Sequence, residues 1–189
     1  MPEIPSELLE AVTTGDRNAV STMLSQGVDI HGEDAYGLHV LNHATGIGNL
    51  DMVKLLVDHG ADLNAKTESG WTALHDATKR CNNELIKWLA DQGADMNAQA
   101  DYGMTALHLA LHDLSEETAR MLVNHGADPN ILNDFGMTPF HIAVDQGFSE
   151  IIEFLLNNGA DTDIVNQRGE TALGIANFRG YGDIAELLK

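Results

Sequence analysis

Gly103-Met-Thr-Ala-Leu-His-Leu-Ala110 is one of five related segments that decide how this chain folds. The glycines that open these segments follow one another at a constant step of 33 residues. The other four are Gly37-Leu-His-Val-Leu-Asn-His-Ala44, Gly70-Trp-Thr-Ala-Leu-His-Asp-Ala77, Gly136-Met-Thr-Pro-Phe-His-Ile-Ala143 and Gly169-Glu-Thr-Ala-Leu-Gly-Ile-Ala176. A fixed period of this length indicates stacked repeats, because each repeat is one structural unit that packs on its neighbours.

A second phrase, Gly-Ala-Asp, keeps the same step. It begins at Gly60, Gly93, Gly126 and Gly159, with a weaker copy at Gly27. Apolar residues at helical spacing precede each copy, for example Leu85, Ile86 and Leu89. The glycine therefore marks the loop after a helix, where the chain turns through a left-handed conformation.

Polar residues predict where the two helices of each repeat begin. A hydroxyl or carboxamide before a helix accepts a hydrogen bond from an amide that the first turn leaves unpaired. The N-caps expected for the first helices are Ser6, Thr72, Thr105, Thr138 and Thr171, and those for the second helices are Asp16, Asn49, Asn82 and Ser115. The sequence therefore predicts two short helices in each repeat.

The repeat resembles the ankyrin repeat, whose unit carries a turn, a Thr-Pro-Leu-His-x-Ala helix start, a second helix and a Gly-Ala-Asp loop. The resemblance implies an all-α ankyrin-repeat solenoid of about six stacked helix-turn-helix repeats with hairpin-like turns. We expect one continuous domain with an N-terminal capping repeat at 1–36, four full repeats at 37–168 and a C-terminal capping repeat at 169–189.

The charge of the chain restricts its partners. The sequence has 10 Lys and Arg against 29 Asp and Glu, a net charge of −19. Such a chain is repelled by nucleic-acid phosphates and anionic lipids, so we expect neither a nucleic acid nor a membrane as its partner. The single cysteine, Cys81, and the lack of a signal-like start favour a cytoplasmic protein, expected to be a monomer on its own.

Among the nine histidines, His108 and His112 stand at the i, i+4 spacing of a helical metal pair. No Glu lies beside His108 as a zinc protease needs, and Cys81 alone cannot complete a thiolate site, so we expect no metal. His75, His108 and His141 share one repeat position, where the resemblance implies a structural imidazole that bridges adjacent loops. No phosphate-binding loop, nucleophile elbow or Cys/His pair is present. We therefore expect no cofactor and no catalytic activity, with an enzyme of unrecognised site kept as the last alternative.

The resemblance implies that residues around the turn glycines and at the ends of the first helices line a concave binding face. Tyr, Trp, Phe and Met are common at those turn positions, and such residues favour interface cores. Packing on the neighbouring turn is the alternative for these rings. The expected partner-binding residues are Tyr36, Leu38, Trp71, Lys79, Arg80, Tyr102, Met104, His112, Asp113, Phe135, Met137 and Asp145.

The segment from residue 121 to 167 contains no Lys or Arg, and it carries seven carboxylates: Asp128, Asp134, Asp145, Glu150, Glu153, Asp161 and Asp163. An acidic surface steers a basic partner. We therefore expect an adaptor or inhibitor of a protein with a basic patch. Hydroxylation of the loop residues Asn64, Asn97 and Asn130 by another enzyme is an alternative that the resemblance implies.

Several residues depart from the repeat, and three of these irregularities bear on its packing. His39 and Asn42 replace the threonine and histidine of the second repeat, which predicts that this repeat is less well held. Leu114 replaces a glycine between helices. Asp76 stands where the other repeats have Leu109, Ile142 and Ile175, so it is either a displaced surface residue or a polar contact.

The loop assignment predicts that Gly126→Val lowers the free energy of unfolding by more than about 1 kcal/mol, because a β-branched residue resists a left-handed turn. Glu150→Gln, on an exposed helix position, should change it by less than about 0.5 kcal/mol. Urea unfolding of both variants measures the difference. Equal losses would show that the loop assignment is wrong.

Overall fold

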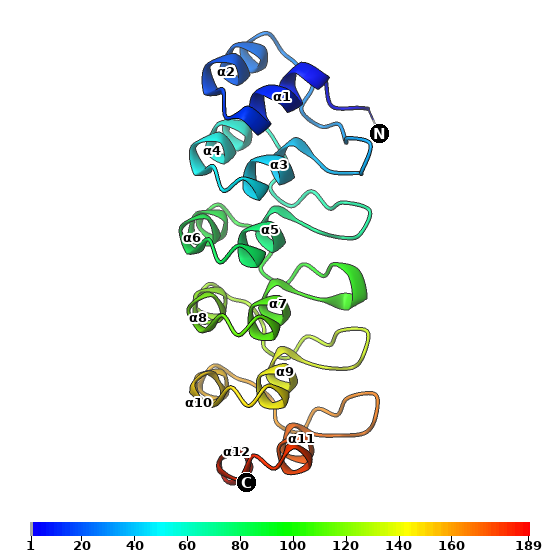
Figure 1. The fold of residues 1–189 in the computed structure, drawn as a ribbon, viewed down its shortest axis with the longest axis vertical. Coiled ribbons are helices and arrows are strands. Elements are labelled where there is room, and N and C mark those ends of the chain that lie inside the picture. The colour runs from blue at the N-terminus through cyan, green and yellow to red at the C-terminus, as the bar shows by residue number, and fades with distance from the viewer. Residues whose placement is uncertain (1) are drawn as a thin grey trace. The chain divides into compact units, whose positions relative to one another are not determined.

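The computed structural model describes residues 2–189, and these residues form twelve α-helices in two compact units (Figure 1). The first unit ends at Ala94 and holds α1 (Ser6–Thr14), α2 (Arg17–Ser25), α3 (Val40–Gly46), α4 (Leu50–Asp58), α5 (Ala73–Lys79) and α6 (Asn83–Asp91). The second begins at Asp95 and holds the short 3-10 turn η1 (Asp101–Gly103), α7 (Ala106–His112), α8 (Glu116–Asn124), α9 (Pro139–Asp145), α10 (Ser149–Asn157), α11 (Ala172–Arg179) and α12 (Gly182–Leu187).

The predicted all-α class is confirmed. Residues 2–189 contain no β-strand, and their only extended pairings are isolated bridges between Glu3 and Glu33 and between Glu33 and His39. The helices form six consecutive pairs, in agreement with the expected number of repeats. The boundaries at residues 36 and 168 stay predictions.

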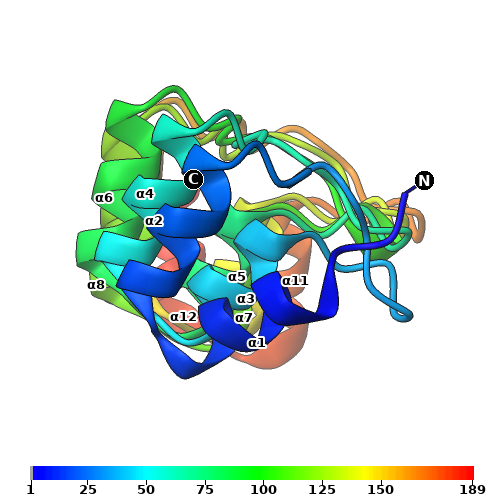
Figure 2. The same cartoon turned by 90° about the horizontal axis from the view of Figure 1, so that it is seen from above.

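In the first unit, α1, α3 and α5 form one layer, and α2, α4 and α6 form a second layer (Figure 1). Each first-layer helix packs on its own partner, and α3 also packs on both α1 and α5. Leu8, Leu56, Leu74 and Ile86 are fully buried between the layers. The turns that join the pairs extend beyond the α1 and α3 side, away from α2 and α4 (Figure 2).

The second unit repeats this arrangement. Its first layer is α7, α9 and α11, and its second layer is α8, α10 and α12 (Figure 1). Leu107, Leu122, Phe140 and Ile151 are completely buried. Because each short helix buries only one face against its partner, the contacts from one pair to the next supply the rest of the core.

A threonine and a histidine cap the N-terminus of α7. Thr105 Oγ1 accepts a hydrogen bond from the His108 amide (3.4 Å), while the Thr105 amide donates to His108 Nδ1 (3.1 Å). Thr138 and His141 form the same pair at the start of α9, with 3.1 Å and 3.2 Å. These capping boxes satisfy amides that a helix start leaves unpaired.

The buried imidazole of His108 also reaches the next turn. Because Nδ1 accepts from Thr105, the ring is neutral with its proton on Nε2, which donates to the Met137 carbonyl oxygen (3.1 Å). The expected bridging role is therefore confirmed for His108. In His141, by contrast, Nε2 is buried without a hydrogen-bond partner among residues 2–189.

The predicted caps hold at the second helices of the first unit, where Asp16, Asn49 and Asn82 accept from the amides of Ala19, Met52 and Leu85 at 3.0 to 3.1 Å. The prediction for Ser6 is wrong. Pro5 occupies the N-cap, and Ser6 is the first helical residue, with its hydroxyl bonded to Glu7. The turn before α1 lacks the Gly-x-Thr sequence that places a hydroxyl at the cap elsewhere.

Left-handed backbone occurs where the repeat predicts it. Gly126 has a φ of +96°, and a side chain there would meet no atom within 4 Å, so conformational strain alone disfavours a larger residue. Leu114 keeps the left-handed conformation of the glycine that it replaces, with a φ of +55°. A branched or bulky residue held in this region stores strain energy.

His108 should make the stability of the chain depend on pH. Burial lowers the pKa of this imidazole from 6.5 to about 4, although hydrogen bonds to the Met137 and Ile131 backbone oppose the shift. Between those values the unfolded state binds more protons, so stability is lost as the pH falls from 7 toward 4. The loss at pH 5 attributable to His108 should be about 2 kcal/mol.

Urea unfolding at pH 7 and pH 5 measures this loss, with His108→Asn as the control because asparagine stands naturally at this repeat position in Asn42. The variant should be less stable at pH 7 and should lose less stability on acidification. An unchanged pH dependence would mean that the imidazole is not held neutral by burial.

Candidate functional site

Two aromatic rings lie exposed on neighbouring turns of the second unit. The side chains of Tyr102 and Phe135 are 66% and 56% exposed. Their ring centroids are 6.0 Å apart and their planes differ by 20°, so the rings are stacked. The sequence predicted both residues as partner contacts, and the structure brings them together as one apolar surface, which we call the Tyr102–Phe135 pair.

Hydrogen bonds within and between the two turns, from backbone and side-chain groups, hold this pair. Tyr102 has a φ of +59°, a conformation that costs a side-chain-bearing residue about 1–2 kcal/mol. Its carbonyl oxygen accepts from the Asp134 amide (2.8 Å), and the Phe135 amide donates to Asn133 Oδ1 (2.9 Å). Gln99 Nε2 adds bonds to the Gly103 and Leu132 carbonyl oxygens (both 2.9 Å). The rings are therefore presented by a fixed backbone.

Met104 and Met137, predicted as partner contacts, are half-buried. The sulfur atom of Met104 accepts from Asn133 Nδ2, and that of Met137 accepts from Asn166 Nδ2, both at 3.5 Å. The two side chains thus pack against the following turn and support the exposed rings.

An open groove of about 460 Å³ lies next to the pair in the second unit. Phe135, Met137 and Asp145, all predicted site residues, line it together with Phe178 and Arg179. Arg179 donates two hydrogen bonds to the Asp145 carboxylate (2.7 and 2.8 Å). Phe178 is 83% exposed and is not among the predicted contacts, although it occupies the same helix-end position of the repeat as Asp145.

The carboxylates of residues 121–167, the segment without Lys or Arg, do not form one patch. Asp134 lies on the turn beside Phe135, Glu150 and Glu153 lie on α10, and Asp128 and Asp161 accept from amides of their own loops (2.8 and 2.9 Å). Asp145 is neutralised by Arg179, which comes from a later helix. Asp101 and Asp134 are the exposed carboxylates that directly precede Tyr102 and Phe135.

In the first unit, the turn before α3 presents Tyr36, whose side chain is 85% exposed. Asp34 shapes this turn by accepting from the amides of Tyr36 (2.8 Å) and Leu38 (3.0 Å), and its other oxygen lies 2.9 Å from His43 Nε2. Partial burial opposes ionisation, but these bonds outweigh it and lower the pKa of Asp34. Leu38 is half-buried.

The predicted helix-end residues lie on the surface. Lys79 ends α5 and Arg80 follows it, and both are exposed. In the second unit, His112 ends α7 and its Nδ1 lies 3.2 Å from the Asp113 carboxylate. These residues are accessible, and their role as partner contacts stays a prediction.

Asn97 and Asn130 are engaged within the second unit. Asn97 Oδ1 accepts from the Asp128 amide, and Asn130 Oδ1 accepts from the Asp161 amide, both at 2.8 Å. An enzyme that drew either side chain into its active site for hydroxylation would have to break these bonds, and Asn64 is also bonded. Within residues 2–189, no group of three His, Cys, Asp or Glu side chains is placed to hold a metal ion, and no helix is long and apolar enough to cross a membrane.

The family described as "Ankyrin repeats (3 copies)" matches residues 8–100 and 117–189, which is most of the chain. The chain belongs to the ankyrin repeat family. No curated protein is similar enough to this chain to count as a match. Ankyrin repeats are generally protein–protein interaction modules, and the family is typically non-catalytic.

Asp76, a departure from the ankyrin pattern, is a polar contact between two repeats of the first unit. Its carboxylate accepts from Asn42 Nδ2 (3.0 Å), Thr45 Oγ1 (3.3 Å) and Trp71 Nε1 (2.9 Å). Burial raises the pKa of Asp76, although these donors and Arg80 favour the ionised form. The network joins α3 to α5 and resolves the choice that the sequence left open.

The expectation that the second repeat is less well held stays a prediction, although its two substituted residues make polar contacts of their own. Asn42 replaces the usual histidine but bonds to Asp76, and it also accepts from the His39 amide (3.2 Å). The His39 ring lies 3.3 Å from both the Gly32 and the Lys66 carbonyl oxygens. Other polar contacts thus take the place of the threonine–histidine pair.

Trp71 differs from the exposed rings because its indole is half-buried, bonds to Asp76 and packs on His75 with centroids 5.1 Å apart. The alternative of packing on the neighbouring turn describes Tyr102, which stacks on Phe135, whereas Trp71 contacts Asp76 and His75 of its own repeat. Its role as a partner contact stays a prediction.

Trp71→Phe should lower the free energy of unfolding by about 1–2 kcal/mol, since it removes a hydrogen bond to a carboxylate while keeping a ring. Tyr36→Phe is the matched control on an exposed turn and should change stability by less than about 0.5 kcal/mol. Urea unfolding at pH 7 measures both. Equal changes would show that the indole N–H does not support Asp76.

Proposed function

We propose that this chain is a non-catalytic module that binds a protein with a basic surface, through the Tyr102–Phe135 pair and the adjoining groove. The observation that carries the proposal is the exposure of two stacked rings on neighbouring hydrogen-bonded turns, one of which holds Tyr102 in a strained left-handed conformation. Strained backbone that the surrounding structure maintains is a feature of functional sites. Aromatic residues on a fixed backbone also lose little conformational freedom on binding.

The charge around the pair supports a basic partner. Asp101 and Asp134 directly precede the two rings, and the whole chain carries a net charge of −19. An arginine or lysine laid over an exposed ring gains about 0.5–1 kcal/mol from the cation–π interaction, and a nearby carboxylate adds to it. The charge also favours fast association with a basic protein and opposes nucleic acids and anionic membranes.

The role within a cell follows from these features as part of the proposal. A module that covers a basic patch acts as an adaptor, when it links that protein to another, or as an inhibitor, when the patch is functional. The single cysteine supports a cytoplasmic location.

Phe135→Ala and Tyr102→Ala should each weaken binding of the partner at least tenfold, which corresponds to about 1.4 kcal/mol. The partner is the protein that co-purifies stoichiometrically with the wild-type chain, and surface plasmon resonance measures its affinity for each variant. Leu187→Ala, at an exposed apolar position in α12, is the control and should leave the affinity unchanged.

Unaltered affinity in both ring variants, with circular dichroism showing that they are folded, would exclude the Tyr102–Phe135 pair as the binding surface. The basic nature of the partner is tested separately. Its association should slow as salt is added, because screening acts on the encounter.

A further inference from the structure

Asparagine side chains connect consecutive loops in the second unit. The carboxamide of Asn130 accepts from the Asp161 amide (2.8 Å) and donates to the Gly159 carbonyl oxygen (2.8 Å). Asn97 does the same with the Asp128 amide (2.8 Å) and the Gly126 carbonyl oxygen (3.4 Å). Each carboxamide thus satisfies one donor and one acceptor of the next Gly-Ala-Asp loop.

The loop that begins at Gly60, in the first unit, has the conformation of these two acceptor loops. Its Ala61 amide donates to Leu56 at 3.0 Å, as the Ala127 amide does to Leu122. Its Asn64 amide donates to Asp62 Oδ1 at 2.9 Å, which matches the Asn130 and Asp163 amides at 2.8 and 2.9 Å. It therefore presents the same pair of groups, the Asp62 N–H and the Gly60 carbonyl.

No carboxamide among residues 2–189 reaches that pair. The repeat position of Asn97 and Asn130 is occupied in the preceding loop by His31, which is exposed and whose ring makes no hydrogen bond among residues 2–189. In the same part of the chain, the Asp62 amide and the Gly60 carbonyl oxygen also have no protein partner. The structure thus contains a donor and an acceptor arranged for a carboxamide that the sequence does not supply.

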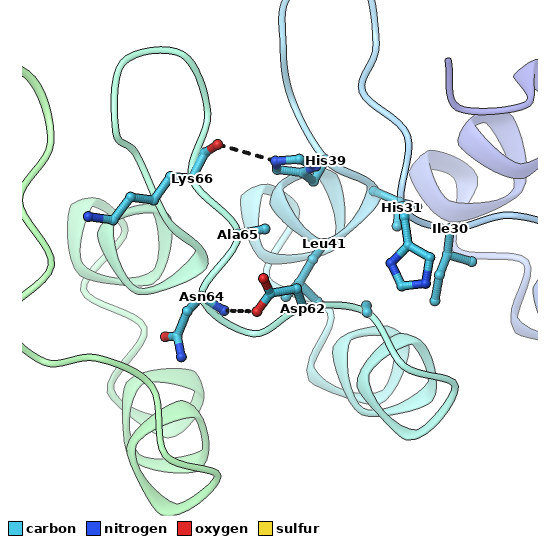
Figure 3. Close-up of a pocket in the computed structure, with 10 residues that line it drawn as sticks. Ile30, His31, His39, Leu41, Asp62, Asn64, Ala65 and Lys66 are labelled. Carbon is cyan, nitrogen blue, oxygen red and sulfur yellow. Dashed lines mark hydrogen bonds between the residues drawn. The ribbon is translucent and has the colours of Figure 1, made fainter. Parts of the chain in front are cut away.

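A pocket of about 430 Å³ lies beside this pair, with Ala61 and Asp62 of the same loop among the residues that line it (Figure 3). Ile30, Val40, Leu41 and Ala61 line it and are almost completely buried, so they form an apolar floor. His31 lies on one side and Asn64 and Lys66 lie on the other, with Asp62 between them (Figure 3). Two bonds join residues of the polar rim, from the Asn64 amide to Asp62 (2.9 Å) and between His39 and the Lys66 carbonyl oxygen (3.3 Å). An apolar floor with a few directed polar groups is typical of a ligand site.

We propose that this pocket binds a primary carboxamide, supplied by an asparagine or glutamine side chain of a partner protein. The carboxamide oxygen accepts from the Asp62 N–H, its NH₂ group donates to the Gly60 carbonyl oxygen, and its methylene groups contact Ile30 and Leu41. The two asparagine contacts of the second unit are the precedent for this geometry. The site shares no residue with the Tyr102–Phe135 pair, so the two proposals stand or fall separately.

A carboxylate of the same shape does not fit as well. It has no proton to donate to the Gly60 carbonyl oxygen, and it would lie close to the Asp62 carboxylate, which repels it. Discrimination between an amide and an acid of equal size is therefore the property that identifies the site.

The test is a titration of the ¹⁵N-labelled chain with propionamide, followed by two-dimensional NMR. The Asp62 amide resonance should shift saturably, with a dissociation constant on the order of 10 mM, as expected for so few ligand atoms. The amide resonances of Asp128 and Asp161, which already bond to asparagine, should not shift and serve as controls in the same sample. Propionate should bind at least fivefold more weakly.

His31→Asn supplies the missing carboxamide from within the chain and should abolish the propionamide shift, while His31→Ala should retain it. N-acetylglutamine N-methylamide should bind at least as tightly as propionamide, since a side chain of a protein is the proposed occupant. Absence of a saturable Asp62 shift, equal binding of propionate, an undiminished shift in His31→Asn, or failure of the glutamine derivative to bind would each overturn the proposal.

Discussion

In the second unit, one buried imidazole connects a helix cap to the next turn, and the exposed surface depends on it. His108 accepts from Thr105 through Nδ1 and donates to Met137 through Nε2. The first bond begins α7, and the second holds the turn that carries Phe135. The bond from Thr105 requires the neutral ring, because Nδ1 accepts only when it carries no proton, so burial and the lowered pKa favour the arrangement that caps α7. The position of Phe135 beside Tyr102 therefore depends on the buried hydrogen bond between His108 and the Met137 carbonyl oxygen.

The residues that depart from the repeat give this chain contacts that a regular repeat lacks. A residue that keeps the pattern caps a helix, forms a turn or packs in the core. Only a residue that departs from the pattern has a side chain available for another contact. Asp76 replaces an apolar residue and joins two repeats through Asn42, Thr45 and Trp71. His31 replaces an asparagine and leaves one loop–loop contact unmade. The first departure adds a polar contact inside the unit, and the second opens a pocket.

The acidic residues are spread more widely over the structure than their positions in the sequence suggest. A long segment without Lys or Arg reads as an acidic patch, but folding places its carboxylates on loops, on α10 and on a turn. Arg179 then pairs with Asp145 from a helix that begins far along the chain. What remains at the Tyr102–Phe135 pair is a small group of exposed carboxylates beside aromatic rings. The net charge of the chain affects how fast a partner associates. The small group of carboxylates at the Tyr102–Phe135 pair affects where on the surface the partner binds.

The sequence by itself determined the repeat, the helix pairs, most caps and the glycine loops, because these depend on short-range geometry that recurs every 33 residues. It also identified Tyr36, Tyr102 and Phe135 as unusual turn residues. Only the tertiary structure decided that Trp71 is held by Asp76, that Asp145 is paired with Arg179, and that His31 leaves the Asp62 amide unpaired. Each of these outcomes depends on which side chains from neighbouring repeats meet. A periodic pattern shows which positions are equivalent, but the partner that a side chain bonds to is set by distance in the folded chain.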